Sequence, residues 1–275
     1  MSKVSKTVIY ILLGLVAIYF LSPFIYMLFS AFKTEAEAIA FPPKLFPSEW
    51  RFQNFADAWN SQPFGRYFLN SVLVTVGTTI GQVLSCSLVA YGFARFNFKG
   101  KNVLFMILLS TMMIPWDVTM IPQYMEFNMF GWINTLKPLI VPAWFGSAYY
   151  IFLMRQFLMG IPKDFEEAAR IDGSGEFNTF NKIVFPLMKP AIAVQAIFTF
   201  VQSWNNYFIP ALVLHSDKKK TLPVLIAQLR SADFLKFDMG QVYVMIAFSI
   251  FPVIIVYILL SRFIVEGVSA GAVKG

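Results

Sequence analysis

The single histidine and the single cysteine limit the chemistry that this chain could carry out. Its 275 residues include one His, His215, and one Cys, Cys86. Neither residue has the companions that a disulfide framework, a multi-cysteine metal site or an HExxH metal site requires. A hydrolase working inside a membrane would need paired aspartates, a Ser–His arrangement or metal ligands, and the apolar stretches of this chain supply none of these. We therefore expect no catalytic residue, no metal and no cofactor in this chain, and no special role for His215.

Asp117 is the first candidate for binding a solute. It is the only charged residue between Val103 and Met125, and an acid inside a membrane is costly unless it faces water or a partner. The alternative is structural: Asp117 lies near the outer end of its segment and accepts hydrogen bonds from backbone groups freed beside Pro115 and Pro122. The sequence leaves both interpretations open.

A second candidate set combines an aromatic ring with amides near the end of an apolar segment: Gln202, Trp204, Asn205 and Asn206. Aromatic faces and amide groups together can hold a sugar ring by stacking and by paired hydrogen bonds. Alternatively, the amides form hydrogen bonds between packed helices, as polar residues of membrane helices commonly do. We expect these residues, with Asp117, to line a substrate pathway, and helix packing remains the alternative.

Six apolar stretches predict the helices that position these candidates. The chain is 57% hydrophobic and only 13% charged, about half the charged share of a soluble domain. About 20 apolar residues in a helix cross the hydrocarbon core, where the backbone must satisfy its own hydrogen bonds. The expected spans lie within residues 7–32, 67–94, 103–125, 138–154, 190–216 and 239–261, the fourth being the shortest. We predict an all-α integral membrane protein with six transmembrane helices.

The basic residues indicate an orientation in the membrane rather than a nucleic-acid partner. The net charge is +7, but the basic residues are scattered between apolar runs and form no continuous basic face. Arg95, Lys99 and Lys101 crowd a short loop without an acid, which favours a cytoplasmic loop. The run 218–220 in a longer, outer loop points the other way. The first apolar run is too long for a signal peptide, so six crossings would leave both termini in the cytoplasm.

The longest inner loop, residues 160–189, predicts two short surface helices. Pro162 suits the first turn of a helix, and the acids at 164, 166 and 167 suit its positive end. Gly173 can adopt the left-handed conformation that ends a helix, and Ser174 can then cap a second helix that runs towards Ile183 and stops near Pro186. The loop is too charged to enter lipid. It could dock another protein or serve only as a solvated connector.

The loop and several shorter motifs resemble one family. Glu167-Ala168-Ala169, followed by Gly173, Ile183 and Phe185-Pro186, resembles the EAA loop of binding-protein-dependent ABC importer permeases, which usually have Leu where Phe185 stands. Further motifs resemble the carbohydrate subfamily, in order along the chain: Ala94-Arg95-Phe96, Met113-Ile114-Pro115, Ile121-Pro122, Asn134-Thr135, Arg155-Gln156-Phe157, Trp204-Asn205, Thr221-Leu222-Pro223 and the tail 270–275. The overall pattern is most similar to the second, six-helix permease of maltose-type importers, with the type I ABC importer fold.

The resemblance implies partners and a division of labour. A cleft of a cytoplasmic ATPase dimer would hold the loop, and the implied coupling residues are Glu166, Glu167, Ala168, Ala169, Arg170, Asp172 and Gly173. The chain lacks the GxxxxGK[ST] phosphate loop, so ATP would be hydrolysed by the partner subunit. A second permease, forming a heterodimer, and an extracytoplasmic solute-binding protein would complete the importer in a bacterial or archaeal cytoplasmic membrane. In maltose-type importers the sibling permease holds most of the substrate contacts, and an acid commonly stands where this chain has Asn206.

These observations give a three-part organisation and leave rival functions to test. We expect residues 1–66 to form the first helix and an outer segment, residues 67–265 a five-helix core with the coupling loop, and residues 266–275 a cytoplasmic tail. The expected cargo is a carbohydrate, an oligosaccharide or glycoside, with glycerol phosphate as an alternative. A gradient-driven secondary transporter would predict paired intramembrane charges and an inverted repeat, which the sequence does not display.

Overall fold

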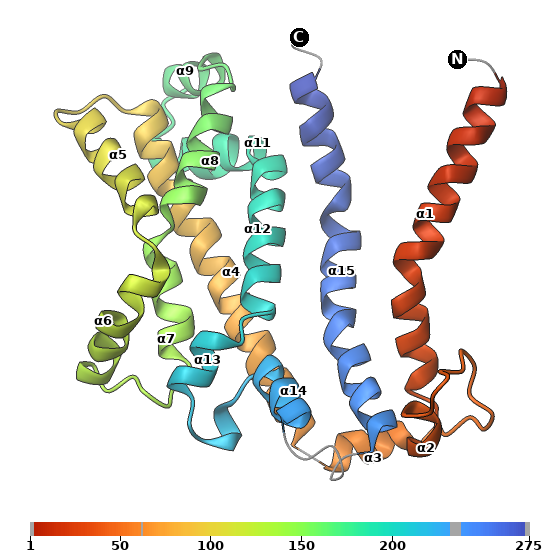
Figure 1. The fold of residues 1–275 in the computed structure, drawn as a ribbon. Helices are drawn as coiled ribbons and strands as arrows, with labels where there is room; N and C mark the ends of the chain where they lie inside the picture. The colour runs from red at the N-terminus through yellow and green to blue at the C-terminus, as the bar shows by residue number, and fades with distance from the viewer. Residues whose placement is uncertain (1–2, 62, 232–237, 273–275) are drawn as a thin grey trace. The chain divides into compact units, whose positions relative to one another are not determined.

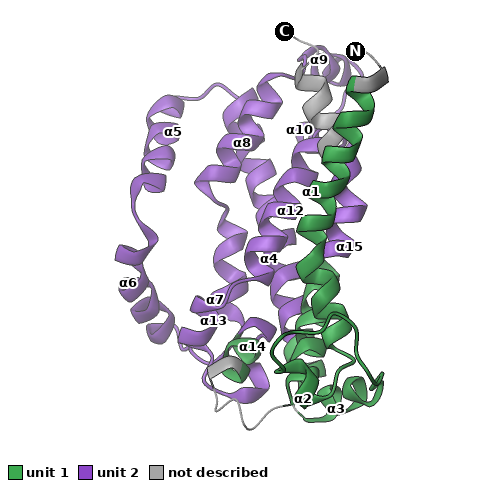
Figure 2. Ribbon diagram, turned by 45° about the vertical axis from the view of Figure 1, so that its right-hand side comes forward, with its two compact units in different colours: residues 1–68, 224–252 green, residues 69–223, 253–275 purple. Residues whose placement is uncertain are grey.

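The computed structural model describes residues 3–61, 63–231 and 238–272, which form helices joined by turns and loops (Figure 1). The chain divides into two compact units, residues 1–68 with 224–252 and residues 69–223 with 253–275 (green and purple in Figure 2). The predicted all-helical membrane fold is confirmed.

Three helices are long and apolar enough to cross a membrane without interruption. They are α1 (Lys3–Ser30), α4 (Phe64–Arg95) and α15 (Met239–Ala272), and their candidate spans cover residues 5–30, 64–95 and 239–263. Most of the apolar side chains of α1 are exposed, as expected of a surface that lipid covers. The first, second and last predicted spans therefore form long helices.

The remaining predicted spans are bent or divided. A 99° bend separates residues 101–113 (α5, Lys101–Ser110, and η1, Thr111–Met113) from α6 (Trp116–Met129). The fourth predicted span is split into α7 (Lys137–Ile140), the 3-10 turn η2 (Val141–Phe145) and α8 (Ala148–Met159). Pro142 is the second residue of η2 and Gly146 follows η2 at φ 85°, so the helix is interrupted there. Counting each bent pair as one span gives up to five candidate spans among the described residues, and a sixth crossing remains a prediction.

In the unit of residues 69–223, the core forms where α4, α8 and the start of α12 (Lys189–Trp204) meet. Its buried residues come from all three helices and from the segment before α12: Cys86, Ala90, Tyr91, Tyr150, Ile151, Met154, Leu158, Phe180, Val184, Met188 and Ala191. Two glycines of α4 allow close approach: a Cβ at Gly81 would lie 2.4 Å from the Trp144 ring, and one at Gly77 would lie 3.1 Å from Ile140. This spacing is the small-xxx-small pattern that brings membrane helices together.

The inner loop forms the two short helices that the sequence predicts, with two corrections. Helix α9 covers Asp164–Ile171, and the second helix comprises α10 (Glu176–Thr179), the π-helical η3 (Phe180–Val184) and α11 (Phe185–Leu187), before a 76° bend into α12. Pro162 precedes α9 instead of lying in its first turn. Ser174 does not cap α10, because Gly175 occupies the N-cap position; the Ser174 hydroxyl accepts hydrogen bonds from Asn178 and Thr179.

The predicted outer segment between α1 and α4 is ordered in the described residues. It contains α2 (Glu35–Ala38) and α3 (Gln53–Ser61), and its aromatic rings contact one another, with Phe32 against Trp50, Phe52 and Phe55. The fully buried Lys33 donates hydrogen bonds to the Ser30 hydroxyl and the Lys44 carbonyl. The remaining helices are α13 (Phe208–Val213), η4 (Asp217–Lys219) and α14 (Leu222–Ser231).

Candidate functional site

Helix α9 has one face packed on the protein and one face free. Glu166 and Ala169 are buried at 4% and 5% exposure, whereas Glu167, Ala168 and Arg170 are exposed. At 100° per residue the two buried positions lie on one side of the helix, Glu167 and Ala168 lie on the opposite side, and Arg170 lies at the edge of the buried side, about 40° from Glu166. The structure therefore gives α9 a surface that is available to a partner.

A Schellman turn at Gly173 ends α9. The Gly173 amide donates to the Arg170 carbonyl at 3.0 Å, and the Ser174 amide donates to the Ala169 carbonyl at 2.9 Å. This pair of bonds is the arrangement that closes a helix on a left-handed residue, and Gly173 has φ 80°. The predicted turn is confirmed, with Asp172 exposed at the end of the helix.

A buried ion pair fastens α9 to α4. The Nε of Arg95, near the end of α4, lies 2.6 Å from Oε1 of Glu166, and the side chains are only 4% and 5% exposed. An Nη of Arg95 also donates to the Ile161 carbonyl at 2.9 Å. Breaking a buried pair leaves an uncompensated charge and is strongly destabilising. Glu166, which the resemblance implies to be a coupling residue, is therefore paired inside the protein with Arg95 and anchors the loop.

The second short helix of the loop, α10, is hydrogen-bonded to α4 one turn before Arg95. The Tyr91 hydroxyl lies 3.3 Å from Oε2 of Glu176 at the start of α10. The other Glu176 oxygen accepts from Nε of Arg170 at 2.9 Å, and Glu176 raises the pKa of the Arg170 guanidinium through this hydrogen bond. Both groups of the latter pair are about half exposed, so the pair adds little stability, but it joins α9 to α10.

Three large apolar side chains are exposed on the loop. Phe165 is 51% exposed, Ile171 87% and Phe177 72%. Together with Ala168 they form what we call the docking face, residues 165, 168, 171 and 177. Exposed apolar side chains on a charged loop make this surface a candidate for contact with another protein. The sequence analysis did not single out Phe165, Ile171 and Phe177, although apolar residues inside such a charged segment are a usable signal.

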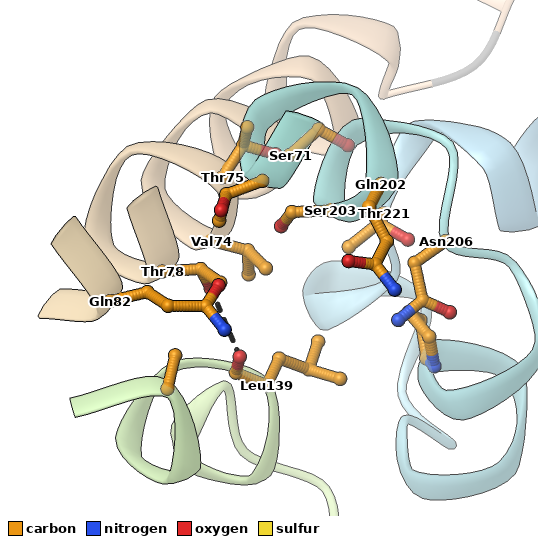
Figure 3. Close-up of a pocket in the computed structure, with 13 residues that line it drawn as sticks. Ser71, Val74, Thr75, Thr78, Gln82, Leu139, Gln202, Ser203, Asn206 and Thr221 are labelled. Atoms are coloured by element: carbon orange, nitrogen blue, oxygen red, sulfur yellow. Dashed lines mark hydrogen bonds between the residues drawn. The ribbon is translucent and has the colours of Figure 1, made fainter. Parts of the chain in front are cut away.

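A polar cavity of about 200 Å³ lies in the same unit, between α4 and the end of α12 (Figure 3). Helix α4 contributes residues at positions 71, 74, 75, 78 and 82, and the end of α12 and its following turn contribute positions 199, 202, 203 and 206. The full lining is Ser71, Val74, Thr75, Thr78, Gln82, Leu139, Ala143, Thr199, Gln202, Ser203, Asn206, Pro210 and Thr221. Nine of these thirteen side chains are hydroxyls or amides.

The structure separates the predicted pathway residues. Gln202 and Asn206 line the cavity. Trp204 is 2% exposed and stacks on Phe200 with centroids 5.9 Å apart, so its ring is packed in the protein rather than among the residues that line the cavity. Asn205 lines a neighbouring cleft. Asp117 is exposed in the first turn of α6, where the helix amides favour an acid, and it lines neither space.

The neighbouring cleft combines amides with aromatic rings. It has a volume of about 450 Å³ and is lined by Trp116, Gln202, Asn205, Asn206, Tyr207, Phe208 and Ile209. Trp116 and Phe208 meet edge to face at 5.4 Å. Sequence reasoning missed Trp116, Tyr207 and Phe208, and it missed the α4 residues 71, 75, 78 and 82, whose spacing of four, three and four is a helical stripe of polar side chains.

The long apolar helices, the fastened surface loop and the polar cavity define a membrane subunit of a transporter. The chain belongs to the family of binding-protein-dependent transport system inner membrane components, which matches residues 84–269. It is thus a multi-pass inner membrane protein and a transport component, not an enzyme, and the ATPase of such an importer is a separate subunit.

Curated relatives and a solved structure agree with this assignment. NgcG, a permease protein of a diacetylchitobiose uptake system from Streptomyces coelicolor, is 32% identical over 92% of this chain and 83% of its own length. MelC, a melibiose/raffinose/stachyose import permease protein from Bacillus subtilis, is 31% identical over 98% of this chain and 98% of its own length. A chain of a bacterial ABC transporter that imports alginate has the same fold, with a TM-score of 0.82 and 24% identity over 96% of this chain and 99% of that chain.

Proposed function

We propose that this chain is the permease subunit of an ATP-driven importer that moves a carbohydrate, an oligosaccharide or glycoside, into the cell. The relatives named above carry diacetylchitobiose and melibiose, raffinose or stachyose in their names, and a third, AraQ of Bacillus subtilis, is a permease for arabinooligosaccharides at 31% identity. The polar lining of the cavity supports a hydroxyl-rich cargo. The coupling residues Glu167, Ala168, Arg170, Asp172 and Gly173, exposed on the loop, would contact the ATPase.

The observation that carries the coupling proposal is the attachment of both legs of the loop to α4. Arg95 holds α9 through Glu166, and Tyr91 holds α10 through Glu176. An ATPase that binds the docking face therefore pulls on α4 itself, because a buried ion pair does not yield as a solvated connector would. Ala169 is buried on the side of α9 that packs against the protein, whereas Ala168 is exposed.

The proposed assembly contains a second permease in a heterodimer, a cytoplasmic ATPase dimer and an extracytoplasmic solute-binding protein. Both termini of this chain would lie in the cytoplasm, the side on which the loop meets the ATPase. The test is affinity purification of the tagged chain in mild detergent followed by mass spectrometry. Recovery of an ATPase, a second permease and a binding protein supports the assembly; a chain that purifies only with itself, even after crosslinking, contradicts it.

Transport is then tested with the purified assembly in proteoliposomes. We expect ATP-dependent uptake of at least one sugar from melibiose, raffinose, diacetylchitobiose and arabinotriose, unaffected by ionophores. Uptake that ionophores abolish and ATP does not drive would favour the gradient-driven alternative. Loss of uptake in Asp117→Asn with the assembly intact would revive a pathway role for that acid. Uptake of glycerol 3-phosphate, and of none of the sugars, would favour the alternative that the importer carries glycerol phosphate.

The docking face is tested separately from the cargo. We expect Phe165→Ser to lower the amount of ATPase that co-purifies with the permease, because it removes a half-exposed ring from the proposed contact. Phe208→Ser, which changes an equally exposed ring in the cleft, is the matched control and should retain the ATPase. Equal ATPase recovery in both variants would contradict the docking assignment.

A further inference from the structure

Three buried hydroxyls that line the cavity, on Thr75, Thr199 and Thr221, have no hydrogen-bond partner among the described residues. Thr75 on α4 is 1% exposed and Thr221, immediately before α14, is 3% exposed, and the Oγ1 atoms of both are buried and unpaired. Burying a hydroxyl without a partner is unfavourable, and most such groups in native proteins are paired. Because both residues line the same cavity (Figure 3), a ligand hydroxyl or a water placed there could satisfy them.

Two other polar groups of the cavity already form hydrogen bonds within the protein. The Thr78 hydroxyl donates to the Leu139 carbonyl at 3.0 Å, and the Ser71 hydroxyl accepts from the Leu222 amide at 2.8 Å. These bonds hold the walls in place. The unpaired threonines, the Ser203 hydroxyl and the amide ends of Gln82, Gln202 and Asn206 are therefore the groups suited to meet a guest.

The lining selects an uncharged guest. Among the described residues, neither the cavity nor the adjoining cleft has a Lys, Arg, His, Asp or Glu in its lining. A phosphate or a carboxylate would enter without a cation to neutralise it, and an uncompensated charge in a buried site is costly. Hydroxyls and amides, by contrast, donate and accept hydrogen bonds equally well and so match the hydroxyls of a neutral sugar.

The cavity and the cleft form a two-part site, because Gln202 and Asn206 line both. The cavity, at about 200 Å³, is below the range of about 300–1,000 Å³ that holds a drug-sized ligand, which suits one sugar ring rather than a chain. The cleft supplies the aromatic faces of Trp116, Tyr207 and Phe208, on which a following ring can stack.

We infer that this permease subunit itself binds an uncharged sugar, with one ring in the polar cavity bonded to Thr75 and Thr221 and the next ring against the aromatic cleft. The inference rests on the proposed function, since it takes the cargo to be a carbohydrate. It adds that substrate contacts lie in this chain as well as in any sibling, and that anionic sugars and phosphate esters are excluded.

The test uses the complete purified importer and the sugar that the uptake assay selects. Saturation-transfer NMR on the complex without its binding protein should detect that sugar and not glycerol 3-phosphate. Thr75→Val and Thr221→Val, which keep the side-chain shape, should each weaken the signal and slow ATP-driven uptake about fivefold, the effect of one lost hydrogen bond. Thr75→Ser, which keeps the hydroxyl, should restore both.

Thr79→Val is the matched control. Thr79 lies on the same helix, and its hydroxyl is also buried and unpaired, but it does not line the cavity. This variant should bind and transport as the unmodified complex does. Sugar uptake and binding unchanged in both cavity variants would show that the cavity holds only water and would overturn the inference while leaving the proposed function standing. An unmodified complex that takes up no sugar would refute the proposed function, and the inference would fail with it.

Discussion

Substitution of Gly173 tests whether the coupling loop depends on its turn. Gly173 has φ 80°, and a Cβ built there meets no atom of this chain within 4 Å. Within the subunit, the cost of a larger residue is therefore that of the backbone conformation alone. Gly175, two residues on, also has open space around its Cβ but has φ −72°, which any residue adopts. The two glycines thus differ in conformation and not in crowding.

The expected cost follows from this geometry. A left-handed conformation costs an ordinary residue about 1–2 kcal/mol, and a β-branched residue more. If the turn opens instead, the two bonds at 3.0 and 2.9 Å are lost, each worth about 0.5–1.5 kcal/mol. The strained turn, at about 1–2 kcal/mol, disfavours the ordered loop by a factor of about 5–30. We expect Gly173→Ala to weaken coupling by about this factor, Gly173→Val to weaken it further, and Gly175→Ala to leave it unchanged.

The assay is uptake per ATP hydrolysed in proteoliposomes, together with the amount of ATPase that remains bound during purification. Gly173→Asn separates strain from crowding at the ATPase surface, because Asn is larger than Ala but tolerates the left-handed region. If backbone strain governs, Gly173→Asn should reduce coupling less than Gly173→Ala does. If contact with the ATPase governs, Gly173→Asn should reduce coupling more. Normal uptake by Gly173→Val, or equal damage from Gly175→Ala, would refute the reasoning.

Two further predictions concern the packing of α4. Glu166→Gln leaves the charge of the buried Arg95 without its partner and should cost about 3–5 kcal/mol of stability. The loss should be measured as less bound ATPase and a lower unfolding temperature in detergent. The double variant with Arg95→Met should recover part of the loss, and no recovery would mean that the two residues act independently. Gly81→Ala forces the Trp144 ring to move and should cost about 1–3 kcal/mol of stability. Gly92→Ala is the control: a Cβ at Gly92 meets open space, so this variant should not lower the unfolding temperature. Equal effects of the two variants would contradict the close packing at Gly81.

The sequence predicts the parts of the fold that depend on long uninterrupted patterns. Helices α1, α4 and α15 follow from apolar runs that exceed the membrane thickness. The third and fourth predicted spans share the composition of the others, but prolines and glycines interrupt them, as Pro142 and Gly146 do before α8. Composition cannot tell whether such residues kink a helix, end it or divide it, because that depends on what packs against the break.

The site shows the same limit at the level of side chains. The turn at Gly173 was predictable because a local motif and one backbone conformation define it. The inward position of Glu166 was not predictable, because it depends on Arg95, 71 residues earlier. In the sequence, Asp164, Glu166 and Glu167 are equivalent acids at the start of a helix. The stripe 71, 75, 78 and 82 could have been seen in the sequence, but its meeting with Gln202 depends on tertiary packing.

The unbroken length of helix α4 between Thr75 and Arg95 has a mechanical consequence. The same rigid rod holds the ion pair with Glu166 at Arg95 and a wall of the cavity at Thr75, 20 residues away, which is about 30 Å at 1.5 Å per residue. A tilt of only about 5° about one end would displace the other by about 2.6 Å, close to the length of one hydrogen bond. If the loop couples to an ATPase and the cavity holds a sugar, as we propose, a small displacement at the loop would be enough to break or remake the hydrogen bonds to that sugar, and one movement of α4 would join energy coupling to release.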